Sequence, residues 1–186
     1  NIMSENIVGT SKFILKVDKL TDDIMEKLEK SMNKNIKLVQ NAAKENCTGF
    51  KYSNGQLANS IISETKKVDN TTVQGKVSTK LEYATYVEFG TGPNGEAHHQ
   101  GTSPNVNPIY KSKGWIIPAS AMDREIAENY GFGVVEDKDG NVIGYKTKGQ
   151  YAHPYMYPAL KDNEDKIVKN IADDLKAEIE KVTEWL

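Results

Sequence analysis

One long amphipathic helix near the start of the chain constrains the fold more than any other feature of the sequence. Between residues 20 and 43, apolar side chains recur at spacings of three and four, which is the period of a single buried helix face. These residues are Leu20, Ile24, Leu28, Met32, Ile36, Val39 and Ala43. Thr21 is a candidate N-cap, and the two acids that follow it suit the positive end of a helix. The sequence therefore predicts a helix that ends near Asn46 and needs other elements to cover one of its faces.

Short segments rich in β-branched residues lie on both sides of this helix. SKFILKV, residues 11–17, predicts an initial strand. IISETKKV and TTVQGKVST predict an antiparallel pair of strands joined by a turn at Asp69 and Asn70. EYATYVEF, residues 82–89, is interpreted as the next strand, with its side chains alternating between two faces.

The second half of the chain changes character. Residues 93–114 have no hydrophobic period and are dense in Gly, Pro, Asn and Ser, which is typical of a functional or mobile loop. A short helix is expected from Ser120 to Tyr130, and FGVVEDKDGNVIGYKT predicts a hairpin with Asp139 and Gly140 near its tip. KGQYAHPYMYPAL is expected to be extended, because residues before proline avoid the helical region.

A final helix completes the predicted fold, with Pro158 in its first turn. Its expected apolar face consists of Leu160, Ile167, Ile171, Leu175, Ile179 and Val182. The predicted class is α+β, with the long N-terminal helix and the C-terminal helix packed on a small antiparallel sheet. We expect one domain over residues 1–186, with a core of 10–93 and 150–186. Residues 94–149 would form an insertion made of the long loop, the short helix and the hairpin.

Composition excludes some classes of function. The chain of 186 residues contains a single cysteine, Cys47, so it forms no internal disulfide. Arg124 is its only arginine, and because base and phosphate recognition favour the arginine fork, sequence-specific nucleic-acid binding is not expected. No apolar run is long enough to span a bilayer, so no membrane partner is expected.

None of the candidate chemical motifs is complete. His98, His99 and His153 invite a metal site, but adjacent histidines diverge and no metal-binding spacing accompanies them. Residues 137–141 resemble a calcium loop only faintly and are better explained as a hairpin tip. Gly90-Thr91-Gly92 is followed by Pro93 instead of a helix with a lysine, which indicates a turn with a positive φ at one glycine. The sequence therefore predicts no active site, no metal and no cofactor.

Three segments together resemble a known family. YATYVEFGTGP, residues 83–93, resembles the signature segment of the tail-completion, or head–tail joining, proteins of long-tailed bacteriophages. GQYAHPYMYPALK, residues 149–161, is similar to the aromatic-proline segment that precedes their last helix, and TGFKYSNGQLANSI, residues 48–61, resembles the step after their first helix. The chain departs from this pattern in the insertion after the glycine turn and in His153, which stands where the family has an arginine.

The resemblance implies a structural virion protein of a phage, a prophage or a phage-tail-like particle, assembled in the cytoplasm of the bacterial host. It implies a ring of six copies at the neck that completes the tail, joins it to the head-side connector and leaves a channel for DNA. The tail tube and the connector would be its other partners. The residues expected to carry assembly are Tyr83, Tyr86, Glu88, Phe89, Gly90, Gly92, Tyr155 and Tyr157. The residues expected in a docking loop are Pro93, His98, His99, Pro104, Pro108, Tyr110 and Trp115.

Two alternatives from other classes stay open at this point. The first is a small metal-dependent hydrolase that uses the three histidines. The second is a carbohydrate-binding module of a tail tip that uses Trp115 and the tyrosines.

Overall fold

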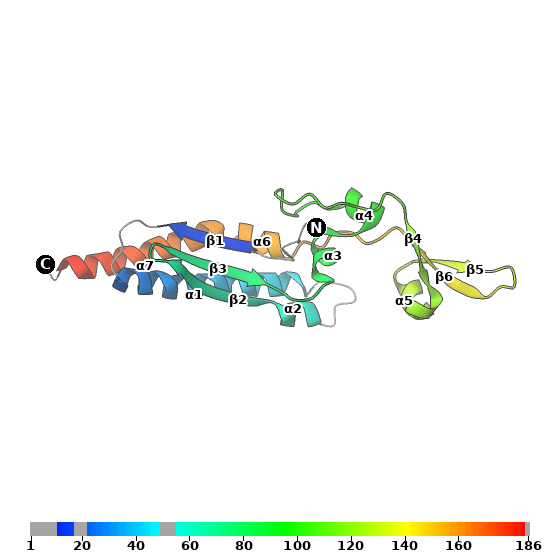
Figure 1. The fold of residues 1–186 in the computed structure, drawn as a ribbon, viewed down its shortest axis with the longest axis horizontal. Coiled ribbons are helices and arrows are strands. Elements are labelled where there is room, and N and C mark those ends of the chain that lie inside the picture. The colour runs from blue at the N-terminus through cyan, green and yellow to red at the C-terminus, as the bar shows by residue number, and fades with distance from the viewer. Residues whose placement is uncertain (1–10, 17–21, 49–54, 185–186) are drawn as a thin grey trace. The chain divides into compact units, whose positions relative to one another are not determined.

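In the computed structural model, the described part of the chain comprises residues 11–16, 22–48 and 55–184 (Figure 1). The chain divides into two compact units. The first unit contains Asn1–Glu88 and Pro154–Leu186, and the second contains Phe89–His153. The chain therefore leaves the first unit once, directly after Glu88, and returns to it once, at Pro154.

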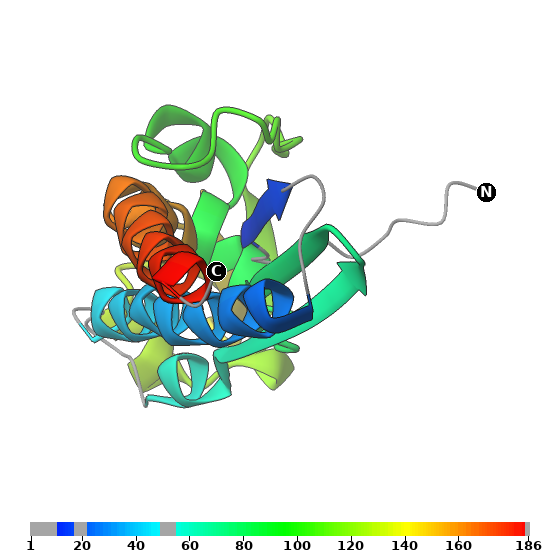
Figure 2. The same cartoon turned by 90° about the vertical axis from the view of Figure 1, so that its left-hand side faces the viewer.

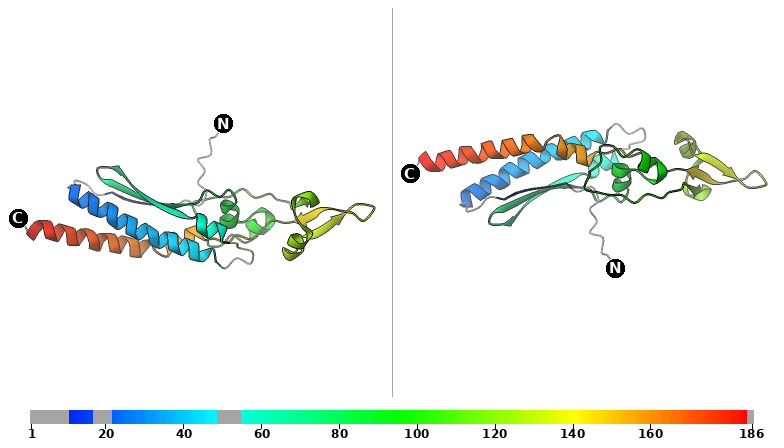
Figure 3. Two further views of the ribbon diagram at one scale, coloured as in Figure 1. Left: turned by 90° about the horizontal axis from the view of Figure 1, so that it is seen from below. Right: turned by 90° about the horizontal axis from the view of Figure 1, so that it is seen from above.

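The first unit is built on two long helices and a three-stranded sheet. Helix α1 spans Asp22–Asn46 and helix α7 spans Glu164–Glu184, and the two run side by side in opposite directions (Figures 1 and 3). Strands β1 (Ser11–Lys16), β2 (Ile62–Asp69) and β3 (Thr72–Ser78) pair antiparallel in the order β1-β3-β2. The long helix, the initial strand and the strand pair joined at Asp69 and Asn70 are thus confirmed, whereas Thr21 and residues 49–54 lie outside the described residues.

Helix α1 lies between the sheet and α7, so its apolar residues form the centre of the first unit (Figures 2 and 3). Its buried apolar residues are Met25, Leu28, Met32, Ile36, Val39 and Ala43. The sheet approaches α1 closely at Gly75 of β3, where an added Cβ would lie 3.0 Å from the Met32 Sδ and 3.2 Å from the Ile36 Cδ1. Glycine at this position lets the helix rest on the sheet. Strand β3 and helix α7 add further core residues, and the rest come from shorter segments: Cys47, Leu57, Ile61, Ala84, Tyr155, Met156 and Ala159.

The segment EYATYVEF is not a strand, which corrects the sequence-based prediction. Helix α3 spans Ala84–Phe89 within it. Ala84 and Glu88 are buried, and Val87 packs against the core, which is the i, i+3, i+4 spacing of a helix face. Tyrosine, threonine and valine favour strands in general, but the burial of this face outweighs that preference here. Short helix α2, Gln56–Ser60, precedes strand β2.

The C-terminal part contains two helices where the sequence predicted one. Helix α6 spans Met156–Lys161, a turn follows at Asp162 and Asn163, and α7 begins at Glu164. Pro158 lies in the first turn of α6, as predicted. Residues 148–155 have no regular secondary structure, and Gly149 has a φ of 88°. Tyr157 precedes a proline yet is helical, so the prediction that KGQYAHPYMYPAL is extended is wrong for its second half.

The apolar face predicted for the last helix is only partly buried. Ile167 and Ile171 are buried, and Leu160 and Leu175 are partly buried against the same core. Ile179 is 46% exposed, so the buried stripe does not extend to the end of α7. The side chain of Val182 lies outside the described residues.

The second unit contains another three-stranded antiparallel sheet. Its strands are β4 (Trp115–Pro118), β5 (Gly133–Glu136) and β6 (Val142–Thr147), in the order β4-β6-β5 (Figure 1). The β5-β6 hairpin is confirmed, with Gly140 at a φ of 81° in its turn. Strand β4 was not predicted, because WIIP is short and follows a segment without periodicity.

Three short helices complete the second unit. Helix α4 spans Gly92–Ala97, so the segment predicted as a continuous loop begins with a helix. The helix predicted from Ser120 is instead a 3-10 turn, η1, at Ala119–Ala121, followed by helix α5 at Arg124–Asn129. Gly131, at a φ of 68°, follows the end of α5 as expected. The predicted α+β class is confirmed.

Candidate functional site

The buried carboxylate of Glu88 is the centre of the candidate site in the first unit. Glu88 is 2% exposed. Its Oε2 accepts hydrogen bonds from the backbone N–H groups of Tyr155 at 2.8 Å and Met156 at 2.9 Å, and its Oε1 accepts one from Tyr157 at 3.0 Å. These donors lie at the start of α6, where a helix has N–H groups without intrahelical partners. Because a carboxylate also complements the positive end of a helix, Glu88 acts as the cap of α6.

Tyr155 and the C-terminal end of α1 enclose this carboxylate. Tyr155 is fully buried, and its carbonyl oxygen accepts a hydrogen bond from the Asn46 Nδ2 at 3.1 Å. Burial raises the pKa of the Tyr155 phenol, and the neighbouring Glu88 carboxylate raises it further. Burial, with a smaller contribution from Glu88, also raises the pKa of the Cys47 thiol to about 12. Cys47 is therefore a neutral core thiol and not a nucleophile.

Two exposed aromatic residues lie in α3 and in the turn directly before it. Tyr83 is 39% exposed and Tyr86 is 57% exposed. The Tyr83 hydroxyl lies 3.4 Å from the Gln56 Oε1, at the long limit of a hydrogen bond. Residues 83–88 therefore contain one buried predicted assembly residue, Glu88, and two exposed ones, Tyr83 and Tyr86. This pair, Tyr83 and Tyr86, is called the tyrosine face below.

The other predicted assembly residues are less accessible. Phe89 is 8% exposed, Tyr155 is fully buried, and Tyr157 is half-buried. Gly90 and Gly92 are buried as well. Their φ angles are 73° and 58°, which confirms the predicted left-handed conformation, although a helix and not a strand precedes them.

In the second unit, the glycines bring two distant segments together in what we call the glycine clasp, residues 90–95 against residues 148–152. Thr91 N donates to the Gln150 carbonyl oxygen at 2.9 Å, and Gln150 N donates to the Thr91 Oγ1 at 3.1 Å. A Cβ added to Gly90 would lie 2.7 Å from the Gln150 oxygen, and one added to Gly149 would collide with the Thr91 oxygen. The turn thus needs glycine both for its φ angles and for close backbone contact.

The predicted docking loop is tied to the rest of the second unit by aromatic contacts. His98 packs against Tyr151 with ring centroids 4.3 Å apart, and His99 stacks on Tyr110 with centroids 5.9 Å apart. The Tyr110 hydroxyl donates to the Phe89 carbonyl oxygen at 2.8 Å. The two adjacent histidines therefore point to different tyrosines, as their opposed directions predicted.

The remaining docking-loop residues vary in position. Pro93 lies in the first turn of α4. Pro104 is exposed, whereas Pro108 and Trp115 are half-buried. The Lys111 Nζ lies 5.4 Å from the centre of the Trp115 ring, so a lysine covers the indole that a sugar-binding platform would have to leave open.

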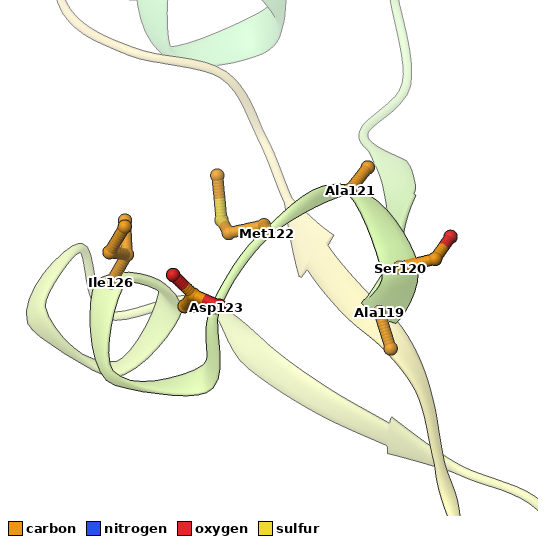
Figure 4. Close-up of a pocket in the computed structure, with 6 residues that line it drawn as sticks. All are labelled: Ala119, Ser120, Ala121, Met122, Asp123 and Ile126. Atoms are coloured by element: carbon orange, nitrogen blue, oxygen red, sulfur yellow. The ribbon is translucent and has the colours of Figure 1, made fainter.

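No constellation suited to catalysis emerges from these contacts. Among the described residues, no three His, Cys, Asp or Glu side chains come together in a way that could hold a metal ion. Asp137 Oδ1 accepts the N–H groups of Asp139 at 2.9 Å and Asn141 at 2.8 Å, which fits the predicted hairpin tip. The second unit has a shallow hollow along η1 and α5 (Figure 4), and only one of its lining residues, Asp123, is titratable.

None of the helices in the described part of the chain combines the length and apolarity needed to cross a bilayer.

Sequence reasoning missed the capping role of Glu88, although one signal for it was present. The N-cap of α6 is Tyr155, which has no side-chain oxygen able to serve the first turn, and the residue before it is Pro154. A helix without a Ser, Thr, Asp or Asn cap requires an acceptor from elsewhere. Glu88 is the one acid in the YATYVEFGTGP segment, so it was a candidate to supply this acceptor.

Comparison with known proteins gives one match. The model of the family described as "Bacteriophage HK97-gp10, putative tail-component" matches residues 11–90. The match begins with β1 and ends at Gly90, so it includes α1, the sheet, the tyrosine face and Glu88. No curated protein matches the chain. No solved structure matches it either.

Proposed function

We propose that the chain is a neck protein of a phage, a prophage or a phage-tail-like particle, and the match of residues 11–90 to the model of a family of phage tail components supports this. In this proposal, copies of the chain form a closed ring, six in number as the sequence resemblance implies. The ring completes the tail, joins it to the head-side connector and leaves a central channel through which DNA passes without sequence recognition. Its role is assembly, without catalysis and without a cofactor.

The observation that carries the proposal is the two-sided construction of α3. On the inner side, the carboxylate of Glu88 is fixed by three backbone donors, so the helix is held firmly in the first unit. On the outer side, Tyr83 in the turn directly before this helix and Tyr86 within it are 39% and 57% exposed. Tyrosines on a rigid element suit a subunit interface, because they bury a large area at low entropic cost and keep a polar tip.

The predicted assembly residues therefore divide into residues that position the surface and residues that contact a neighbour. Glu88 and Tyr155 are enclosed within one chain, so we assign them to positioning the tyrosine face and not to direct contact with a neighbour. Tyr83 and Tyr86 are the residues that we propose to touch the next copy. In a ring, a patch on one subunit meets a different patch on its neighbour, so this surface would be occupied in every subunit.

The experiment is to measure the mass of the full chain in solution by light scattering and to image the same sample by electron microscopy. We expect closed rings, alone or on addition of the tail-tube and connector proteins. A chain with Tyr83→Ser and Tyr86→Ser should lose the ring while keeping the melting temperature of the parent, since both side chains are exposed. Tyr130→Ser, at a tyrosine that is 47% exposed outside the matched segment, is the control. A parent chain that stays monomeric under all these conditions overturns the proposal.

A further inference from the structure

Ile109 is the most exposed large apolar residue in the described part of the chain, at 100%. It precedes Tyr110, whose ring stacks on His99 and whose hydroxyl donates to the Phe89 carbonyl oxygen. The loop is therefore fixed directly beside Ile109, so this exposed apolar side chain is held at a defined position. A large apolar side chain held at a fixed position is available to enter a partner surface.

The same unit contains a hollow whose lining includes apolar and polar side chains. It is lined by Ala119, Ser120, Ala121, Met122, Asp123 and Ile126. Met122, Asp123 and Ile126 project on the same side of the ribbon, so the apolar side chains and the one carboxylate share an opening (Figure 4). Ile126 is 44% exposed, which leaves apolar surface accessible there. Since Ile109 is fully exposed, the hollow is not filled by the Ile109 of its own chain.

The loop that carries Ile109 and the hollow differ in the sign of their charged side chains. Residues 98–114 contain two lysines, Lys111 and Lys113, and no acid. The hollow includes Asp123, and exposed Glu125 follows it, whereas Arg124 is paired with Glu128 at 2.7 Å. The basic loop with its apolar tip is complementary in charge to the hollow, which has an acidic edge, and complementary charge fixes the register of a contact.

We propose that Ile109 of one copy inserts into the hollow formed by η1 and the start of α5 on the next copy. The inference rests on the proposed ring, because it assigns the neighbour in the ring as the partner of the loop. The contact is heterologous, since two different patches of the same chain meet, and such contacts propagate from copy to copy until they close. The lysines beside Ile109 lie against Asp123 and Glu125 of the neighbour.

Disulfide trapping in the full chain tests this contact. A variant with both Ile109→Cys and Ile126→Cys should form a ladder of covalent oligomers on mild oxidation, read on a non-reducing gel. Each single variant should form no such product, because the contact joins position 109 to position 126 and never a position to itself. A mixture of the two single variants should stop at dimers. The parent, with buried Cys47, is the control.

A charge exchange gives an independent measurement that does not depend on new thiols. Asp123→Lys should weaken self-association by about tenfold or more, as expected for one misplaced contact in an interface. Lys113→Asp on the same chain should restore part of it, because the pair formed by positions 113 and 123 then has opposite charges again. Thermal melting of each variant shows that the chains remain folded.

The outcomes separate this contact from the proposed ring. Covalent ladders support the contact, with or without rings in the microscope. Rings that form without any 109–126 cross-link overturn the contact and leave the ring in place. Cross-linking of Ile109→Cys alone overturns it too, since it would show a contact of the loop with itself. A parent that forms neither rings nor cross-links removes both proposals.

Discussion

Glu88 and Tyr155 are 67 positions apart in the sequence, yet the Glu88 Oε2 accepts the Tyr155 backbone N–H at 2.8 Å. This contact joins the two segments that carry the family resemblance, one ending in the glycine turn and the other containing the aromatic-proline run. An acid beside exposed tyrosines would ordinarily suggest surface contact, but this one is enclosed and caps a helix. Its effect on assembly is therefore indirect, through the position of α3 and α6.

Removing the carboxylate should destabilise the first unit. Glu88→Ala leaves three backbone N–H groups without acceptors, and we expect it to lower the free energy of unfolding by about 3 kcal/mol. Glu88→Gln keeps one acceptor oxygen but loses the charge, so we expect about half that loss. Denaturant titration measures both, with Glu82→Gln on an exposed acid as the control. If Glu88→Ala unfolds at the same denaturant concentration as the parent, the cap contributes nothing.

Two glycines with the same backbone conformation allow the role of close contact to be isolated. Gly149 has a φ of 88° and Gly140 has a φ of 81°, so alanine is strained at both. A Cβ at Gly149 would collide with the Thr91 carbonyl oxygen, whereas a Cβ at Gly140 would meet nothing within 4 Å. Gly140→Ala should therefore cost about 1 kcal/mol from backbone strain alone.

Gly149→Ala should open the glycine clasp, because no shift of a flexible side chain can relieve a backbone collision. We expect faster hydrogen exchange at Thr91 and Ala152, whose amides donate within this unit, and no such change in Gly140→Ala. The first unit should exchange as in the parent. Equal exchange in the two variants would mean that close approach adds nothing beyond the φ requirement.

The sequence predicted those elements whose signal is local. Helix α1 follows from seven periodic apolar residues, and the β5-β6 hairpin follows from a turn between two apolar runs. EYATYVEF was misassigned because the helix within it has only six residues. So short a segment of β-forming residues does not distinguish a helical spacing from the alternation of a strand. The break before α7 was missed because the apolar period continues across Asn163.

The candidate site was less predictable than the fold. Positive φ angles at Gly90 and Gly92 followed from turn chemistry, but the segment that they approach, residues 148–152, lies too far along the chain to be inferred. The same holds for Glu88, whose partners begin 67 positions later. A long-range contact leaves only an indirect trace in one sequence, such as a helix that lacks its own cap.

A chain of polar side chains joins α1 to α7 inside the first unit and gives a further prediction. Fully buried Asn35 donates from Nδ2 to the Ser31 carbonyl oxygen at 2.9 Å, and its Oδ1 accepts from the Asn170 Nδ2 at 2.7 Å. Asn170→Leu removes the Nδ2 donor and leaves the buried Asn35 Oδ1 without a hydrogen bond. We expect the free energy of unfolding to fall by about 2 kcal/mol.

Replacing both partners should recover part of that loss. A chain with Asn35→Leu and Asn170→Leu contains no orphaned amide, and an apolar pair can pack where the polar pair lay. Urea titration of the four chains in this double-mutant cycle gives the coupling energy, with Lys169→Ala on the exposed side of α7 as the control. Additive losses in the double variant would show that the two amides act independently.

The buried Cys47 thiol and the buried Tyr155 phenol, both near Glu88, predict a loss of stability at alkaline pH. The Cys47 thiol has its pKa raised to about 12 by burial and by Glu88, and the pKa of Tyr155 is raised for the same reasons. In the unfolded chain these groups ionise near their ordinary values of about 8.5 and 10. The folded state therefore holds protons that the unfolded state releases, so stability is complete below about pH 8.5 and falls as the pH rises towards 12.

For the thiol, the decline should approach about 1.4 kcal/mol per pH unit above pH 8.5, with Tyr155 adding to it above about pH 10. Cys47→Ala removes the first contribution, so between pH 8.5 and 10 its free energy of unfolding should fall less steeply than that of the parent. Denaturant titrations of both chains at pH 7, 9 and 10 measure this difference, and surface lysines cancel because both chains share them. The native thiol should also resist alkylation by iodoacetamide at pH 8.5 and react fully in denaturant. Parallel pH profiles, or rapid alkylation of the folded chain, would show that Cys47 is accessible and ionises as an ordinary thiol.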